Sequence, residues 1–249
     1  MTPAPAERAQ SNGPRSLIVA LVASAALLGG PIPVVAQERT ASDEVEMTAT
    51  VRPDYTERLT PDNAVFVAVD YLTGFQPAIR TMDRYEYQNN LTGLSKTIET
   101  FGLPTIVLGD EGGPRGAFMP QMAEYFADAP KVARSTPSAW EEEAFRDAIA
   151  ATGRRKIVFA GISTDNCTLL TGLGAMRDGY EVYVVVDVSG AESELIEDVA
   201  VTRLVQAGAV PVTWVSLGSE LLVDAGGWET EQGQALARIY TDHTLYFQQ

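Results

Sequence analysis

The chain has 249 residues, with 33 acidic against 18 basic side chains and a formal net charge of −15. This acidity opposes binding to nucleic acids and to anionic membrane surfaces, because both repel a negatively charged protein. The single cysteine, Cys167, excludes an intrachain disulfide and leaves one unpaired thiol in the protein.

Residues 1–36 have the pattern of a secretory signal peptide. Arg8 and Arg15 precede an apolar run at 17–28, and a cleavage point with small residues before it follows at Ala36. We expect removal of this segment and export to the periplasm or beyond, with no membrane contact afterwards. An uncleaved membrane anchor is the alternative, although the run is shorter than the ~20 residues of a spanning helix.

Residues 37–60 are polar and are interpreted as a linker or surface arm, which leaves 61–249 as one domain. Within that domain, short Val- and Ile-rich runs alternate with segments of helical periodicity. Unbroken apolar runs predict strands buried on both faces, as in a parallel sheet. The predicted strands are 64–70, 104–109, 131–133, 156–161, 182–187 and 210–215, and the predicted helices are 85–100, 139–151, 164–178, 192–206 and 229–240.

This alternation predicts a three-layer α/β/α sandwich around a mostly parallel six-stranded sheet. In such folds the functional site lies beyond the carboxyl ends of the strands. Asp70, Arg134 and Cys167 each stand at the end of a different predicted strand, so we expect all three at that edge.

Cys167 stands just beyond a predicted strand, at the start of a predicted helix. Free backbone N–H groups and the positive end of the helix dipole lie there, and they favour the thiolate, the nucleophilic form of cysteine. The position therefore indicates a covalent cysteine hydrolase. A buried cysteine that acts only as a small hydrophobic side chain is the alternative.

Asp70 and Arg134 supply the partners that such a thiol needs. A carboxylate beside the sulfur can accept its proton and later pass it to a leaving amine, while Arg134 balances the negative charges. Alternatively, Asp70 is a turn residue at a strand end and Arg134 is a solvated surface side chain. The backbone amides of Ser163 and Cys167, next to the helix start, are the predicted oxyanion hole.

Three separated segments resemble the isochorismatase-like superfamily of cysteine hydrolases, which includes nicotinamidases and N-carbamoylsarcosine amidohydrolases. They are Gly-Ile-Ser-Thr-Asp-Asn-Cys at 161–167, Val-Asp at 69–70 with Phe75, and Arg134 before Ser-Ala-Trp at 138–140. The resemblance covers most of 61–215, and details such as Leu-Pro-Thr-Ile at 103–106 are most similar to the YcaC-type subgroup.

The resemblance implies roles for individual residues. Asp70 matches the general base of the family and Cys167 its nucleophile, while Arg134 stands where most members carry a lysine. An arginine keeps the positive charge but does not release a proton. Ile162 and Ser163 match the two residues that flank a cis peptide bond in the family.

The nicotinamidase branch of the family binds a metal through an aspartate and several histidines near the second strand. The corresponding segment here, 109–116, contains no histidine, and the only histidine of the chain, His243, is expected on the surface near the C-terminus. We therefore predict no metal, no cofactor and no nicotinamidase activity.

The predicted function is hydrolysis of an amide-type carbon–nitrogen bond in a small molecule through a thioester, by a homo-oligomeric enzyme. Phe75, Phe118 and Trp140 are the predicted walls of the substrate pocket, with ordinary core packing as the alternative. Two other functions stay open: a redox-responsive or binding protein with a silent site, and a structural oligomeric subunit. The sequence does not identify the substrate.

Overall fold

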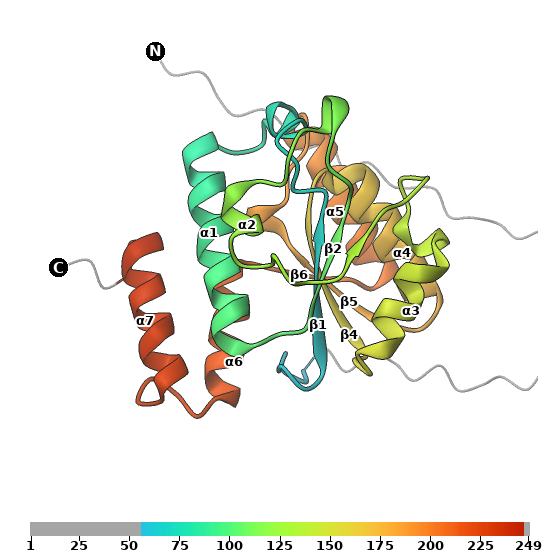
Figure 1. Cartoon of the computed structure of the whole chain (residues 1–249). Coiled ribbons are helices and arrows are strands. Elements are labelled where there is room, and N and C mark those ends of the chain that lie inside the picture. Colours follow the sequence, from blue (N-terminus) through green and yellow to red (C-terminus); the bar gives the residue numbers. More distant parts are fainter. Residues whose placement is uncertain (1–55, 247–249) are drawn as a thin grey trace, which may run out of the picture. The chain divides into compact units, whose positions relative to one another are not determined.

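The computed structural model describes residues 56–246. Six strands form one sheet in the order β3-β2-β1-β4-β5-β6, and every neighbouring pair is parallel. Helices cover both faces of the sheet, so the predicted three-layer α/β/α sandwich is confirmed (Figure 1). The strands are β1 (Ala64–Val69), β2 (Thr105–Leu108), β3 (Lys131–Val132), β4 (Lys156–Gly161), β5 (Glu181–Val185) and β6 (Val210–Val212).

The order of the strands creates a topological switch point. Strands β1, β2 and β3 succeed one another toward one edge of the sheet, after which β4 returns to pair with β1 on its other side. The carboxyl ends of β1 and β4 therefore flank the position where ligands bind in open parallel sheets. Every residue of these two central strands is buried, in keeping with their mostly apolar sequences.

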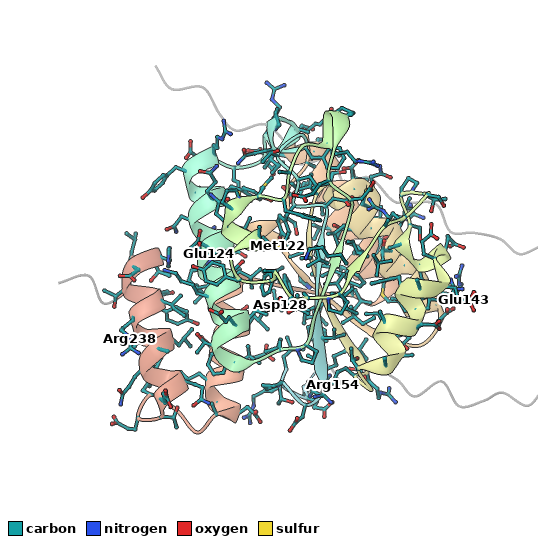
Figure 2. The ribbon with its side chains drawn as sticks, in the orientation of Figure 1. Met122, Glu124, Asp128, Glu143, Arg154 and Arg238 are labelled. Atoms are coloured by element: carbon teal, nitrogen blue, oxygen red, sulfur yellow. The ribbon has the colours of Figure 1, made fainter. Side chains whose placement is uncertain are left out.

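Two hydrophobic layers enclose the sheet. Helices α1, α6 and α7 pack together on one face, and α3, α4 and α5 cover the other (Figure 1). Charged side chains such as Glu143 on α3 and Arg238 on α7 lie on the outside of these layers (Figure 2). The helices are α1 (Arg84–Phe101), α2 (Pro120–Ala123), α3 (Glu143–Ala151), α4 (Leu169–Arg177), α5 (Glu194–Ala207), α6 (Trp214–Asp224) and α7 (Glu231–His243).

The last strand is shorter than predicted. The strand expected at 210–215 ends at Val212, and α6 begins at Trp214. Thr213 caps this helix, because its hydroxyl accepts a hydrogen bond from the Ser216 amide and the Ser216 hydroxyl accepts one from the Thr213 amide. This reciprocal cap starts a helix at a point where the β-branched and aromatic residues alone favour a strand.

The described part of the predicted linker belongs to the domain. Leu59 is fully buried in the core, and its amide donates a hydrogen bond to Oε2 of Glu220 at 2.7 Å. The domain therefore begins before residue 61. The predicted signal peptide at 1–36 and the linker residues 37–55 lie outside the described residues. Between residues 56 and 246, no helix combines the length and apolar character that crossing a bilayer requires.

The only histidine is not a simple surface residue, contrary to the prediction. His243 ends α7 and is half-buried, with its ring nitrogens 2.9 Å from Nζ of Lys96 and 2.9 Å from Oδ1 of Asn89. Both partners belong to α1. The histidine therefore helps to hold the last helix against the first.

Candidate active site

Three connecting segments supply the residues at the switch point. Asp70 directly follows β1, Arg134 stands two residues after β3, and Cys167 lies in a single π-helical turn between β4 and α4. Asp70 adopts a positive φ of 50°, which is uncommon for a residue with a side chain. Gly109 leaves room for it, because a Cβ there would lie 2.8 Å from Oδ1 of Asp70.

The three predicted catalytic side chains are in contact. Nη1 of Arg134 lies 2.6 Å from Oδ1 of Asp70, and Nη2 donates a second hydrogen bond to Oδ2 of the same carboxylate. Nη2 also lies 2.8 Å from the sulfur of Cys167. The side chains of Asp70 and Arg134 are 2% and 10% exposed, so the ion pair is well shielded from water. The guanidinium therefore bridges the carboxylate and the sulfur, as the sequence predicted.

Burial and the neighbouring carboxylate oppose ionisation of the Cys167 thiol. Burial raises the pKa of Cys167, the charge of Asp70 raises it further, and Arg134 only partly opposes them, so the pKa is about 11. Burial also lowers the pKa of Arg134, but the hydrogen bond and charge of Asp70 outweigh this effect and raise it. The position at a helix start favours the thiolate, whereas burial and the neighbouring carboxylate act against it.

The backbone before Cys167 fits closely against β1. Gly161 has a φ of 147°, and a Cβ at this position would lie 1.9 Å from the carbonyl oxygen of Val69, so only glycine fits. The amide of Ile162 donates a hydrogen bond to that same carbonyl at 3.0 Å. The peptide bond between Ile162 and Ser163 is cis, as the resemblance implied. The oxyanion hole formed by the Ser163 and Cys167 amides stays a prediction.

Two cavities border the sulfur. The larger has a volume of about 420 Å³, and the smaller, on the side of Asp70 and Arg134, has a volume of about 210 Å³. Phe75 and Cys167 line both, so Phe75 lies at the cavity walls as predicted, and its contact with a substrate stays a prediction. The remaining lining of the larger cavity is Ala78, Ile162, Ser163, Asp165, Asn166, Glu192 and Ile196.

The other two predicted pocket residues lie elsewhere. Trp140 is 2% exposed in the core, where its Nε1 donates a hydrogen bond to Asp178 at 2.6 Å. The side chain of Trp140 packs over Gly174, where an added Cβ would lie 2.6 Å from the Trp140 Cβ and 2.7 Å from the ring atom Cγ. Phe118 is 9% exposed and lines a separate cavity of about 220 Å³ with Met122. Their expected role at the cavity walls is corrected, because both rings are part of the core.

Five residues of the larger cavity were not predicted: Ala78, Asp165, Asn166, Glu192 and Ile196. Asp165 and Asn166 precede Cys167 directly, so the motif itself was a signal for them. Glu192 and Ile196 come from the segment that starts α5, and nothing local in the sequence connects them to the thiol. Only the packing of α5 beside the π-helical turn brings them to the cavity.

The loop after β2 also reaches the site. Asp110 and Arg115 form an ion pair at 2.7 Å and line the smaller cavity, with each side chain 44% exposed. Within the described part of the chain, no three His, Cys, Asp or Glu side chains gather as a metal site would require. A metal-free reaction stays a prediction.

Comparison of the chain with known proteins identifies a class of hydrolases that share this fold. The isochorismatase domain model matches residues 64–216. The chain belongs to the isochorismatase family and is a hydrolase of that family.

Its relatives include YcaC proteins, in agreement with the subgroup predicted from the sequence. The probable hydrolase YcaC of Escherichia coli is 34% identical over 75% of this chain and 88% of its own length. YcaC from Pseudomonas aeruginosa, solved with hexane-2,5-diol and covalent acrylamide, has a TM-score of 0.71 and 34% identity, covering 76% of this chain and 92% of that one. The Escherichia coli structure, described as an octameric hydrolase of unknown specificity, has a TM-score of 0.70 and 34% identity, covering 75% of this chain and 90% of that one.

Proposed function

We propose that this protein hydrolyses an amide-type carbon–nitrogen bond of a small molecule, with Cys167 as nucleophile. The observation that carries the proposal is the guanidinium of Arg134, which touches both the Asp70 carboxylate and the Cys167 sulfur. A nucleophile, a base within reach and a fixed cation are the parts that covalent hydrolysis requires.

The first half of the reaction forms the thioester. Asp70 takes the thiol proton as the sulfur attacks the carbonyl carbon, which gives a tetrahedral intermediate. Amides of Ser163 and Cys167 hold its oxyanion. The protonated Asp70 returns the proton to the departing nitrogen, the carbon–nitrogen bond breaks, and ammonia or an amine leaves.

The second half releases the acid. Asp70 removes a proton from a water molecule, whose oxygen attacks the thioester carbonyl. The carbon–sulfur bond then breaks, and Asp70 passes its proton to the departing sulfur, so the enzyme returns to its starting state. Asp70 thus serves as base and acid in both halves.

Arg134 acts through its charge. A thiol with a pKa of about 11 is rarely ionised near neutral pH, so its thiolate must form as the reaction begins. Proton transfer to Asp70 moves negative charge from the carboxylate to the sulfur, and the bridging guanidinium contacts both groups. It therefore compensates the charge before and after the transfer, without giving up a proton.

The relatives support further parts of the proposal. The Pseudomonas aeruginosa relative holds covalent acrylamide, a small amide that reacts with nucleophiles, and the Escherichia coli relative is octameric. We therefore propose a small-molecule substrate and a homo-oligomeric assembly for this chain. Export after removal of residues 1–36 is proposed from the sequence pattern alone.

A screen for ammonia release tests the proposal directly. Small primary amides, carbamoyl compounds and imides are incubated with the purified protein and with a Cys167→Ala variant. We expect at least one class to release ammonia with the native protein only. Equal release by the variant would exclude Cys167 as the nucleophile.

The thiol pKa of about 11 favours one alternative, a silent binding or redox-responsive protein on the same fold. In that case no amide, carbamoyl compound or imide is hydrolysed, and the thiol reacts with iodoacetamide only as its thiolate fraction rises at alkaline pH. Ammonia release that is lost in Cys167→Ala excludes this alternative.

A further inference from the structure

The larger cavity carries negative charge on the wall around the thiol. Asp165, from the π-helical turn, and Glu192, from the segment before α5, both line the cavity that Cys167 borders. Its other side chains are apolar or neutral, and no lysine, arginine or histidine lines it. A ligand that reaches the sulfur from this side therefore meets two carboxylates.

These carboxylates are available to a ligand. Among the ion pairs of residues 56–246, neither Asp165 nor Glu192 has a cationic partner. Both side chains are exposed at the cavity wall. Arg134, the cation in contact with the sulfur, is already bound to Asp70. An incoming positive group would therefore find uncompensated negative charge.

The smaller cavity offers a contrast. Its charged side chains are paired, Asp70 with Arg134 and Asp110 with Arg115, so its lining is balanced. Of the two cavities, only the larger has unpaired charged side chains in its lining, and both of them are negative. A concave wall of one sign raises the local concentration of oppositely charged molecules.

We infer that Asp165 and Glu192 select substrates that carry a positive charge, as an amine or guanidinium, on the acyl side of the scissile bond. This inference rests on the proposed function, because it assigns the larger cavity to the acyl group that Cys167 attacks. Apolar Phe75 and Ile196 line the same cavity and suit a short hydrocarbon spacer between the charge and the carbonyl.

Thiol labelling tests the charge preference without any need for turnover. Three methanethiosulfonates of similar size are compared: one with a trimethylammonium group, one neutral and one with a sulfonate. In each case the thiolate forms a mixed disulfide and releases methanesulfinate. Cys167 is the only cysteine, so all labelling reports this site. Rates are divided by those measured with free cysteine.

The critical variant combines Asp165→Asn with Glu192→Gln. Its matched control combines Glu194→Gln with Asp198→Asn, which removes the same charge from exposed positions of α5 that do not line the cavity. We expect the native protein to favour the cationic over the anionic reagent by about tenfold, a preference that the critical variant loses and the control largely keeps. Glu192→Gln alone leaves the turn before Cys167 intact. In this variant the preference for the cationic reagent should fall by about threefold.

Absence of the preference in the native protein, or an equal loss in both double variants, would overturn the inference. A second measurement compares hydrolysis of 4-aminobutanamide with that of pentanamide, its uncharged counterpart. For the native protein, we expect a lower KM for the cationic amide than for pentanamide. In the critical variant, the KM for the cationic amide should rise. If labelling shows the preference but no amide is hydrolysed, the proposed function fails alone; if amides are hydrolysed without preference for charge, only the selection fails.

Discussion

Both ends of the sheet contain a buried ion pair, and only one of them borders a cavity with a nucleophile. At the carboxyl end, Arg134 joins Asp70 and Cys167 beside two cavities. At the amino end, Nζ of Lys156 lies 2.6 Å from Glu181 and 3.1 Å from the hydroxyl of Tyr183, with side chains of the ion pair 1% and 6% exposed.

The two pairs differ in what their charges accomplish. Burial lowers the pKa of Lys156, but the hydrogen bonds of Glu181 and Tyr183 outweigh it, so its pKa is raised and the cation is secured. At the other end, burial and the charge of Asp70 raise the pKa of a thiol, and the pairing with Arg134 only partly opposes them. Burial and charge pairing alone therefore do not mark a functional site; an ionisable nucleophile and an opening to solvent do.

Replacing the nucleophile gives the largest expected effect. Cys167→Ala removes the atom that forms the thioester, so turnover should fall by a factor on the order of 10⁴ or more. The melting temperature should change little, because the side chain borders two cavities instead of filling the core. Ammonia release and thermal unfolding measure the two properties. A variant that unfolds at a much lower temperature would make the sulfur a structural element.

Removing the base should separate thiol reactivity from turnover. After burial, the Asp70 charge is the largest contribution that raises the pKa of Cys167, and Arg134 lowers it. Asp70→Asn removes the raising charge and keeps the lowering one, so the pKa falls and iodoacetamide reacts faster at neutral pH. Turnover should nevertheless fall by about 10²–10⁴-fold, because the proton acceptor is lost. Slower alkylation and slower turnover together would contradict the assigned charges.

Breaking the pair at the amino end should affect stability and leave the chemistry intact. Lys156→Met removes the buried cation of Glu181 and leaves it only the more exposed Arg155, 3.3 Å away, so the loss should be up to about 3–5 kcal/mol of unfolding free energy. Denaturant titration measures the loss, and turnover per folded molecule should match the native protein. The double variant with Glu181→Leu, which removes both charges, should recover much of the stability. A folded Lys156→Met protein without activity would remove the contrast between the two ends.

These contrasts show how far the sequence was informative. The parallel sheet, the edge of the sheet that holds the site and the meeting of Asp70, Arg134 and Cys167 were predictable, because parallel strands bring their carboxyl ends to one rim. The thiol pKa was not, since it depends on the balance among burial, Asp70 and Arg134. A position at a helix start gives only one contribution to that balance.

The cavity walls were the least predictable part. Trp140 and Phe118 lie close in sequence to predicted site segments, yet both rings pack in the core. Whether an aromatic side chain faces a core or a cavity is decided by contacts such as that of Trp140 with Gly174, which lies on another helix. Glu192 reaches the cavity through the packing of α5, which sequence periodicity does not describe.

The carboxylate of Asp187, which follows β5 at the carboxyl end of the sheet, should give the smallest effect. Burial raises the pKa of Asp187 to about 6, although the hydrogen bond from the Trp214 amide at 2.9 Å lowers it. Between about pH 4 and pH 6 the folded protein keeps a proton that the unfolded chain has lost, so stability falls as pH rises through this window and levels off above it. Asp187→Asn should flatten this part of the profile, measured by denaturant titration at each pH. If the contribution of Asp187, taken as native minus variant stability, rises across the window, the raised pKa is contradicted.

The covalent intermediate provides the most direct test of the central claim. An amide that releases ammonia in the screen is mixed with the native protein, the reaction is stopped with acid within milliseconds to seconds, and the intact mass is measured. We predict an added mass equal to the acyl group, located on the peptide that contains Cys167 and removed by hydroxylamine. Steady hydrolysis with no such adduct, undiminished in Cys167→Ala, would contradict a thioester mechanism at this sulfur.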